Sequence, residues 1–154
     1  TEILYMGGVC SQPAVPQADG WFSWQLRVGF AETDAQRIVH HAEYLVYMEE
    51  ARCELVRALG VPYKLLEERG VNLVVTRADL IYKAPAVYDD LLRVRTRVGC
   101  VRSREVVFEY RIEHADSGRL LVEGVTQHVF VDRDLKAIRA PEWAVSALVH
   151  INSD

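Results

Sequence analysis

The stretch that decides the fold is residues 30–60, which read FAETDAQRIVHHAEYLVYMEEARCELVRALG. From about residue 41 or 42 to residue 59, apolar side chains recur at spacings of three and four, which is the pattern of an amphipathic helix. The apolar positions are Tyr44, Leu45, Met48, Ala51, Leu55, Val56 and Leu59. Charged residues, Arg52 among them, occupy most of the others, and Gly60 is a typical stop. We predict a helix of about eighteen residues, roughly 27 Å long.

Two chemically active groups stand directly before this helix. Glu32, Thr33 and Asp34 form an acidic turn, and His40 and His41 form a pair. The first N–H groups of a helix lie unpaired at the positive end of its dipole, so they can polarise a carbonyl oxygen. A carboxylate nearby can act as nucleophile or general base. We interpret the segment as an active site.

Asp34 has a second interpretation, because Asp is also common as a cap of turns and helices. It lies too far before the predicted helix for a simple N-cap. A turn cap therefore stays open as its role.

Strands are predicted on both sides of the helix. Residues 21–30 alternate, with Phe22, Trp24, Leu26, Val28 and Phe30 on one side. After a short helix at 63–69, period-two patterns predict strands at 71–83, 90–100, 105–113 and 119–131. In the second of these four, an apolar face opposes a basic one. The apolar face is Leu92, Val94, Thr96 and Val98, and the other is Leu91, Arg93, Arg95 and Arg97.

The order of these elements predicts an α+β fold. A long helix followed by antiparallel strands is best accommodated by a curved sheet wrapped around the helix, with a terminal amphipathic piece at 141–149. The chain of 154 residues fits one domain. We expect a flexible lead-in at residues 1–20 and a single domain at residues 21–154.

Composition and charge argue against several classes of protein. The net charge of -4 argues against nonspecific nucleic-acid binding. Cys10, Cys53 and Cys100 are widely spaced without a CxxC, so neither a disulfide framework nor a zinc site is expected, and a reducing cytoplasm fits best. No apolar run is long enough for a membrane span, and no leader pattern opens the chain.

A metal site is not expected at the histidine pair. Adjacent His side chains diverge, and His40, His41 and Glu43 form neither HxxxH nor HExxH. Cys53, in the middle of the predicted helix, has no His placed by sequence to activate it, so we expect a buried spectator. We expect no cofactor.

The motif in this segment resembles that of the hotdog-fold acyl-CoA thioesterases. Residues 32–44, ETDAQRIVHHAEY, follow the family's order of acidic residue, Thr, Asp, small residues, two aliphatics, an aromatic or His, His, two residues and Tyr. The match continues in Glu50-Ala51-Arg52 and covers about residues 21–143. Weaker matches are Tyr82-Lys83-Ala84-Pro85, Asp89-Asp90, Glu123-Gly124 and Val131-Asp132. The chain looks most like the 4-hydroxybenzoyl-CoA thioesterase type and the short-chain enzymes encoded with the Tol-Pal system.

One departure from the family pattern concerns the turn after Asp34. These enzymes usually carry Gly there, whereas this chain has Gln36 and Arg37. Gly is often used where backbone must approach a ligand or adopt positive φ. The departure bears on substrate shape and on activity.

The resemblance implies roles for the residues of the motif. Asp34 would attack the thioester or activate water, and the backbone N–H of His41 would bind the carbonyl oxygen. The His41 side chain would orient the thioester or protonate the thiolate, although a cap or a subunit contact is an alternative. His40 would be a packing or pocket-wall residue, Tyr44 would line the acyl pocket, and Arg37 would contact substrate.

Coenzyme A carries phosphates, for which Arg side chains are efficient partners. Arg102 and Arg104, in a predicted turn between strands, are the candidates, with Arg77 and Lys83 behind them. The alternative is that they are solvent-face arginines like Arg93, Arg95 and Arg97.

The resemblance also implies partners. We expect an acyl-CoA substrate and a dimer whose sheets join, with each site made from both chains, and a tetramer through sheet-face packing. Two alternatives to acyl-CoA hydrolysis stay open: a non-hydrolytic acyl-CoA-binding hotdog protein, and a thioesterase acting on acyl-carrier-protein thioesters. A hotdog dehydratase or hydratase would need a different motif.

Overall fold

The structure, a computed structural model, describes residues 20–149, so all of the expected lead-in except Gly20 lies outside it. The described elements, in chain order, are β1 (Phe22–Arg27), the 3-10 helix η1 (Phe30–Glu32), α1 (Glu43–Ala58), α2 (Tyr63–Glu68), β2 (Asn72–Tyr82), β3 (Leu91–Val101), β4 (Glu105–His114), β5 (Leu120–Val131) and α3 (Glu142–Val149). Among them, no helix combines the length and apolar character needed to cross a membrane.

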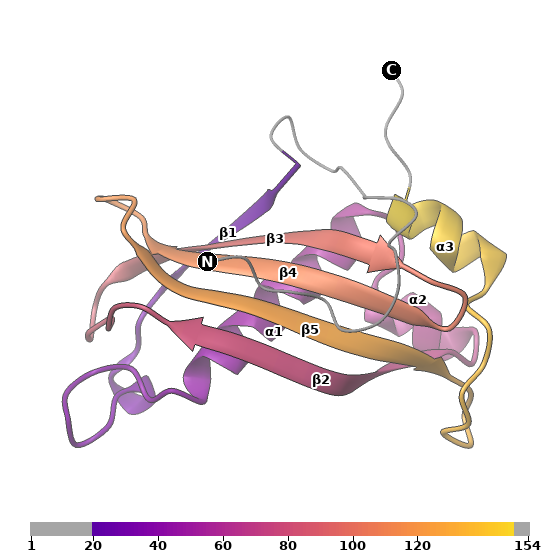
Figure 1. Ribbon diagram of the computed structural model, residues 1–154, viewed down its shortest axis with the longest axis horizontal. Helices are drawn as coiled ribbons and strands as arrows, with labels where there is room; N and C mark the ends of the chain where they lie inside the picture. The colour runs from indigo at the N-terminus through magenta and orange to yellow at the C-terminus, as the bar shows by residue number, and fades with distance from the viewer. Residues whose placement is uncertain (1–19, 150–154) are drawn as a thin grey trace.

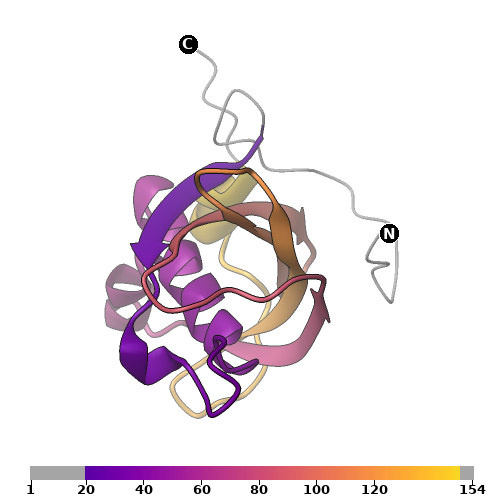
Figure 2. The same cartoon turned by 90° about the vertical axis from the view of Figure 1, so that its left-hand side faces the viewer.

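The strands form one five-stranded antiparallel sheet in the order β1-β3-β4-β5-β2. The sheet curves around α1, which runs along its concave side (Figures 1 and 2). β1 and β2 are the edge strands. This arrangement confirms the predicted α+β class and is the hotdog fold.

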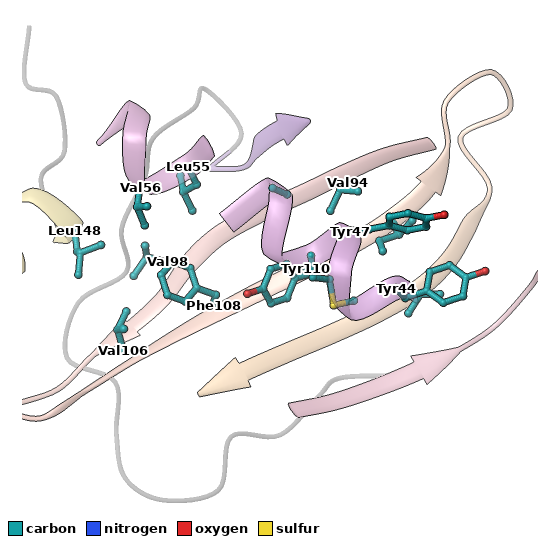
Figure 3. Close-up of a cluster of buried hydrophobic side chains, with 14 of the residues drawn as sticks. Tyr44, Tyr47, Leu55, Val56, Val94, Val98, Val106, Phe108, Tyr110 and Leu148 are labelled. Carbon is teal, nitrogen blue, oxygen red and sulfur yellow. The ribbon is translucent and has the colours of Figure 1, made fainter. Parts of the chain in front are cut away.

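The alternation predicted for β3 is confirmed. Leu92, Val94, Thr96 and Val98 are buried toward α1, and the arginines between them are half-buried on the opposite face. There Arg93 Nη1 lies 2.9 Å from Glu113 Oε1 on the neighbouring strand. Buried side chains of β3, β4 and α1 meet in the space between sheet and helix (Figure 3). Apolar burial of this kind is the main favourable contribution to folding.

The end of α1 follows the prediction. Gly60 has a φ of 87°, a left-handed conformation that Gly adopts without steric cost. Its N–H donates to Arg57 O at 3.1 Å, and the N–H of Val61 donates to Val56 O at 2.9 Å. These two bonds form a Schellman motif, which satisfies carbonyl groups of the last turn.

Phe30 was predicted on the inner side of the first strand, and this prediction is wrong. β1 ends at Arg27, and Phe30 opens η1 with 77% of its surface exposed. The Glu32 carboxylate accepts the N–H of Gly29 at 3.3 Å, which caps η1 and turns the chain out of the strand. A local side-chain cap therefore overrides the alternation.

The buried stripe of α1 also differs from the predicted one. Leu45, predicted on the apolar side, is 40% exposed, whereas Arg52, predicted among the polar positions, is only 8% exposed. Arg52 is buried because hydroxyl groups of Tyr63 and Tyr110 accept its N–H groups, at 2.8 and 3.0 Å. The buried residues of α1 are Tyr44, Tyr47, Met48, Ala51, Arg52, Leu55 and Val56.

Candidate active site

A pocket of about 540 Å³ lies where the loop before α1 meets the end of β2. The loop contributes Asp34, Gln36, Ile38, Val39, His40 and His41. Tyr44 from the first turn of α1 and residues 82–85 from the end of β2 complete the lining. The fold thus brings Asp34, His40, His41 and Tyr44 of the predicted site together.

Asp34 sits in a tight turn. The N–H of Asp34 donates to Ile38 O at 3.0 Å, and the N–H of Arg37 donates back to Asp34 O at 2.9 Å. The carboxylate oxygen Oδ1 accepts the N–H of Gln36 at 2.8 Å, which is an Asx turn. Asp34 therefore caps its turn through one oxygen, and within residues 20–149 its other oxygen, Oδ2, accepts no hydrogen bond.

Arg37 holds this turn in an unusual backbone conformation. Its φ is 66°, in the left-handed region that favours glycine. Arg37 lies in the turn where the resembling enzymes usually carry Gly. The Arg37 side chain is exposed and is not part of the pocket lining, whereas Gln36 lines the pocket.

The two peptide units that flank His41 are held by different partners. The C=O of His40 accepts the N–H of Glu43 at 2.9 Å. Past His41, the N–H of Ala42 donates to His40 Nδ1 at 3.1 Å, so Nδ1 is the acceptor and the ring hydrogen is assigned to Nε2. In the part of the chain that the structure describes, the N–H of His41 itself has no acceptor. A free amide therefore stands just before α1.

Aromatic side chains form the inner wall of the pocket. Tyr44 is 3% exposed, and its hydroxyl accepts the N–H of Ala86 at 3.3 Å. Its ring contacts those of Tyr82 and Tyr47 edge to face, at centroid distances of 5.6 and 5.9 Å. Tyr44 and Tyr47 extend from α1 at the same end of the core (Figure 3). Burial raises the pKa of the Tyr44 hydroxyl, so the group stays protonated at neutral pH.

Glu32, the acidic residue that opens the motif, has a structural role in this geometry. Besides capping η1, its carboxylate accepts the hydroxyl hydrogen of Tyr47 at 2.5 Å. Burial, together with this carboxylate, raises the pKa of Tyr47. The pair joins η1 to α1 and so helps to fix the loop that carries Asp34.

Of the predicted phosphate-binding residues, Lys83 lines the pocket, whereas the two main candidates lie elsewhere. Arg102 and Arg104 stand at the turn between β3 and β4, which is at the opposite end of the sheet from the pocket (Figure 1). Nη1 of Arg102 lies 3.4 Å from Glu105 Oε2. One copy of the chain therefore does not bring these residues to Asp34. Arg77, one of the two candidates behind them, lies 2.6 Å from Asp79 Oδ2 on β2.

Sequence reasoning gave no site role to several residues of the pocket lining, among them Tyr82. It ends β2 and donates its hydroxyl hydrogen to His41 O at 2.9 Å. The segment Tyr82-Lys83-Ala84-Pro85 had already been matched to the family pattern. The alternation of apolar and polar residues, however, does not show which end of the strand faces the loop before the helix. Over residues 20–149, no group of three or more His, Cys, Asp or Glu side chains could hold a metal ion.

The chain is similar to known proteins in sequence and in structure. The sequence model of the Thioesterase-like superfamily matches residues 28–148. A putative esterase of Aquifex aeolicus is 34% identical over 127 residues, which are 82% of this chain and 97% of that protein. The acyl-CoA thioester hydrolase YbgC of Escherichia coli O6:H1 is 36% identical over 111 residues, 72% of this chain and 82% of YbgC.

A solved structure extends the likeness to three dimensions. The crystal structure of a hypothetical protein from Thermus thermophilus superposes with a TM-score of 0.78 at 38% identity, and the match covers 83% of this chain and 98% of that one. The family match spans β2 to β5 but not β1, and it includes Asp34, the histidine pair and Tyr82. The chain belongs to the Thioesterase-like superfamily.

Proposed function

We propose that the protein hydrolyses the thioester bond of an acyl-CoA to the free acid and CoA, as the name of its relative YbgC describes for that protein. One observation supports this function most strongly. A single pocket joins a carboxylate with one unbonded oxygen, at Asp34, to the unpaired backbone N–H of His41 beside the start of α1. Thioester hydrolysis needs these two groups, a nucleophile or base and an oxyanion donor.

The proposed reaction starts with the thioester carbonyl oxygen bound to the N–H of His41. Asp34 Oδ2 attacks the carbonyl carbon, or it takes a proton from a water molecule that attacks in its place. Negative charge develops on the carbonyl oxygen, where the amide and the positive end of the α1 dipole stabilise it. The C–S bond then breaks and CoA leaves as a thiolate. On the nucleophilic route, water hydrolyses the acyl-Asp34 anhydride.

The other residues of the pocket orient the reactants. The Gln36 N–H on Oδ1 restrains the carboxylate and leaves Oδ2 for chemistry. The His41 imidazole orients the thioester, and His40 and Tyr44 border the acyl group. A thiolate is a good leaving group, so proton donation by His41 contributes less than the oxyanion contact.

A second copy of the chain would supply the binding site for the CoA phosphates. β2 is an edge strand, with one side free to pair with another strand. Antiparallel pairing of two β2 strands would bring the Asn72 end of one sheet, on the side of the Arg102–Arg104 turn, beside the Tyr82 end of the other. Arg102, Arg104 and Arg37 are the proposed phosphate contacts, in a dimer that can assemble further into a tetramer.

The proposed location is the cytoplasm. Cys53 is a free thiol, as expected in a reducing compartment. Burial raises the pKa of the Cys53 thiol, which disfavours the reactive thiolate.

The decisive experiment is a steady-state screen of wild type and Asp34→Asn against aromatic and aliphatic acyl-CoAs of graded length. We expect Asp34→Asn to lower kcat at least 100-fold while its circular dichroism stays that of wild type. Asparagine can still accept the Gln36 N–H, so the turn is kept and only the chemistry is removed. Hydrolysis at the wild-type rate by Asp34→Asn would refute the proposal.

Two alternatives have their own tests. The bulky Gln36-Arg37 turn, where the resembling enzymes usually carry Gly, favours a non-hydrolytic acyl-CoA-binding protein. Calorimetry with an intact acyl-CoA would reveal this role as tight binding without product. Parallel assays with acyl-CoA and acyl-carrier-protein thioesters of the same acyl group would separate the two substrate classes.

A further inference from the structure

We infer that Tyr82 is a positioning residue, whose hydroxyl fixes the peptide next to the oxyanion donor and the tautomer of His40. The catalytic part of this inference depends on the proposed function. Tyr82 comes from β2, far in sequence from the loop that it contacts. Its hydroxyl donates to His41 O at 2.9 Å, and its ring meets the His41 ring edge to face at 6.5 Å.

The peptide unit that accepts the Tyr82 hydrogen bond has both its C=O and its N–H hydrogen-bonded. The His41 carbonyl and the Ala42 N–H belong to one planar unit. The carbonyl accepts from Tyr82, and the N–H donates to His40 Nδ1 at 3.1 Å. Hydrogen bonds in such a chain polarise one another, so each strengthens the next. The hydroxyl of Tyr82 thus also favours the Nε2–H tautomer of His40.

The preceding peptide unit carries the proposed oxyanion donor. Its carbonyl, that of His40, accepts the N–H of Glu43 at 2.9 Å. In a trans peptide the N–H points opposite to the C=O, so the His41 N–H points away from the first turn of α1. His41 therefore lies between two anchored peptide units, and its backbone can rotate only if one of them is released. The Tyr82 hydroxyl is the side-chain anchor that comes from the sheet.

Tyr82 can be tested without a large effect on stability. It is 49% exposed, so loss of its hydroxyl leaves no deeply buried polar group. Phenylalanine keeps the ring contacts with His41 and Tyr44. Tyr82→Phe therefore removes the anchor and preserves the shape of the pocket.

We expect Tyr82→Phe to lower kcat about 5-fold, the factor that corresponds to loss of one ordinary hydrogen bond, with KM within about twofold of wild type. The matched control is Tyr88→Phe, at a surface tyrosine that is 56% exposed and outside the pocket lining. Its kcat and KM should equal those of wild type. An unchanged kcat in Tyr82→Phe, or a rise in KM that accounts for the whole loss of kcat/KM, would overturn the inference.

A second readout does not need enzymatic activity. The ¹⁵N shifts of the His40 ring report its tautomer, and amide exchange reports the mobility of Ala42. In wild type we expect an unprotonated Nδ1, and in Tyr82→Phe faster exchange at Ala42 and a mixture of tautomers. Identical spectra would overturn the inference even if the chain proves to be a thioesterase. Conversely, the expected spectral change in a chain that hydrolyses no thioester would refute the proposed function and keep the hydrogen-bond role of Tyr82.

Discussion

Arg52 Nη1 donates a hydrogen bond of 3.0 Å to the hydroxyl of Tyr110 in the core between α1 and the sheet. The chain of polar groups continues from Tyr110 to Thr126 Oγ1 at 2.6 Å and on to His128 Nε2 at 2.8 Å. Tyr63 accepts the Arg52 Nε–H at 2.8 Å. A guanidinium charge is thus buried with two phenol hydroxyls as partners, an arrangement that costs free energy if one partner is lost.

Tyr110→Phe tests this network. The substitution keeps the ring in the core but removes one of the two hydroxyl partners of Arg52 and one of the two partners of Thr126. Hydrogen bonds to charged groups contribute about 1.5–3 kcal/mol. We expect the free energy of unfolding in urea to fall by about 2 kcal/mol. Tyr88→Phe, at the exposed surface, should stay within about 0.5 kcal/mol of wild type. A Tyr110→Phe protein as stable as wild type would show that water or a shifted side chain replaces the hydroxyl.

His128, at the other end of the network, makes stability depend on pH. Burial, followed by the charge of Arg52, lowers its pKa from 6.5 to about 3. Between these values the unfolded chain binds a proton that the folded protein does not, so falling pH favours unfolding. The contribution is complete above pH 6.5, and it is lost with a slope of up to about 1.4 kcal/mol per pH unit as pH falls toward 3.

The measurement is urea unfolding of wild type and His128→Gln at several pH values. Glutamine can still bond to Thr126 but does not titrate, so the variant should lose less stability than wild type between pH 6.5 and 4. Carboxylates contribute equally to both proteins and cancel in the comparison. Parallel pH profiles would mean that His128 is not the group responsible.

The turn at Arg37 offers a test of backbone conformation. Its φ of 66° disfavours β-branched residues and is tolerated by Asn. We expect Arg37→Asn to be at least as stable as wild type and Arg37→Val to be about 1 kcal/mol less stable. Both variants lack the charge of Arg37, so the difference between their stabilities reports the effect of the backbone conformation. Thermal unfolding measures it, and equal melting temperatures would contradict the left-handed assignment.

The sequence predicted the regular elements well because their burial is periodic. The predicted limits of α1 and of β2 to β5 lie within a few residues of those observed. Phe30 and Arg52 were misplaced for opposite reasons, a local cap at Glu32 and long-range hydroxyl partners from α2 and β4. Neither the cap that ends the strand nor a partner 58 residues away appears in a periodic pattern.

The residues of the site were predicted or missed for the same physical reason. Asp34, His40, His41 and Tyr44 share one segment, and the structure gathers them in one pocket. Tyr82 is contributed by another strand and was missed, because its role depends on sheet register. Arg102 and Arg104 were chosen for their charge and their place in a predicted turn, and the β3–β4 turn lies at the far end of the sheet. Whether they reach CoA depends on the second copy of the chain, which local sequence patterns do not describe.

Packing between β5 and α1 gives the last prediction. A Cβ atom added at Gly124 would lie 2.5 Å from Met48 Cε and 2.9 Å from Met48 Sδ, closer than real contacts allow. The methionine end is flexible, so Gly124→Ala should fold but lose about 1–3 kcal/mol of stability. Met48→Ala removes the obstructing atoms, and in that background the same glycine substitution should cost at least 1 kcal/mol less. Urea unfolding of the four proteins of this cycle measures the coupling. Additive effects would mean that α1 does not approach β5 closely at this position.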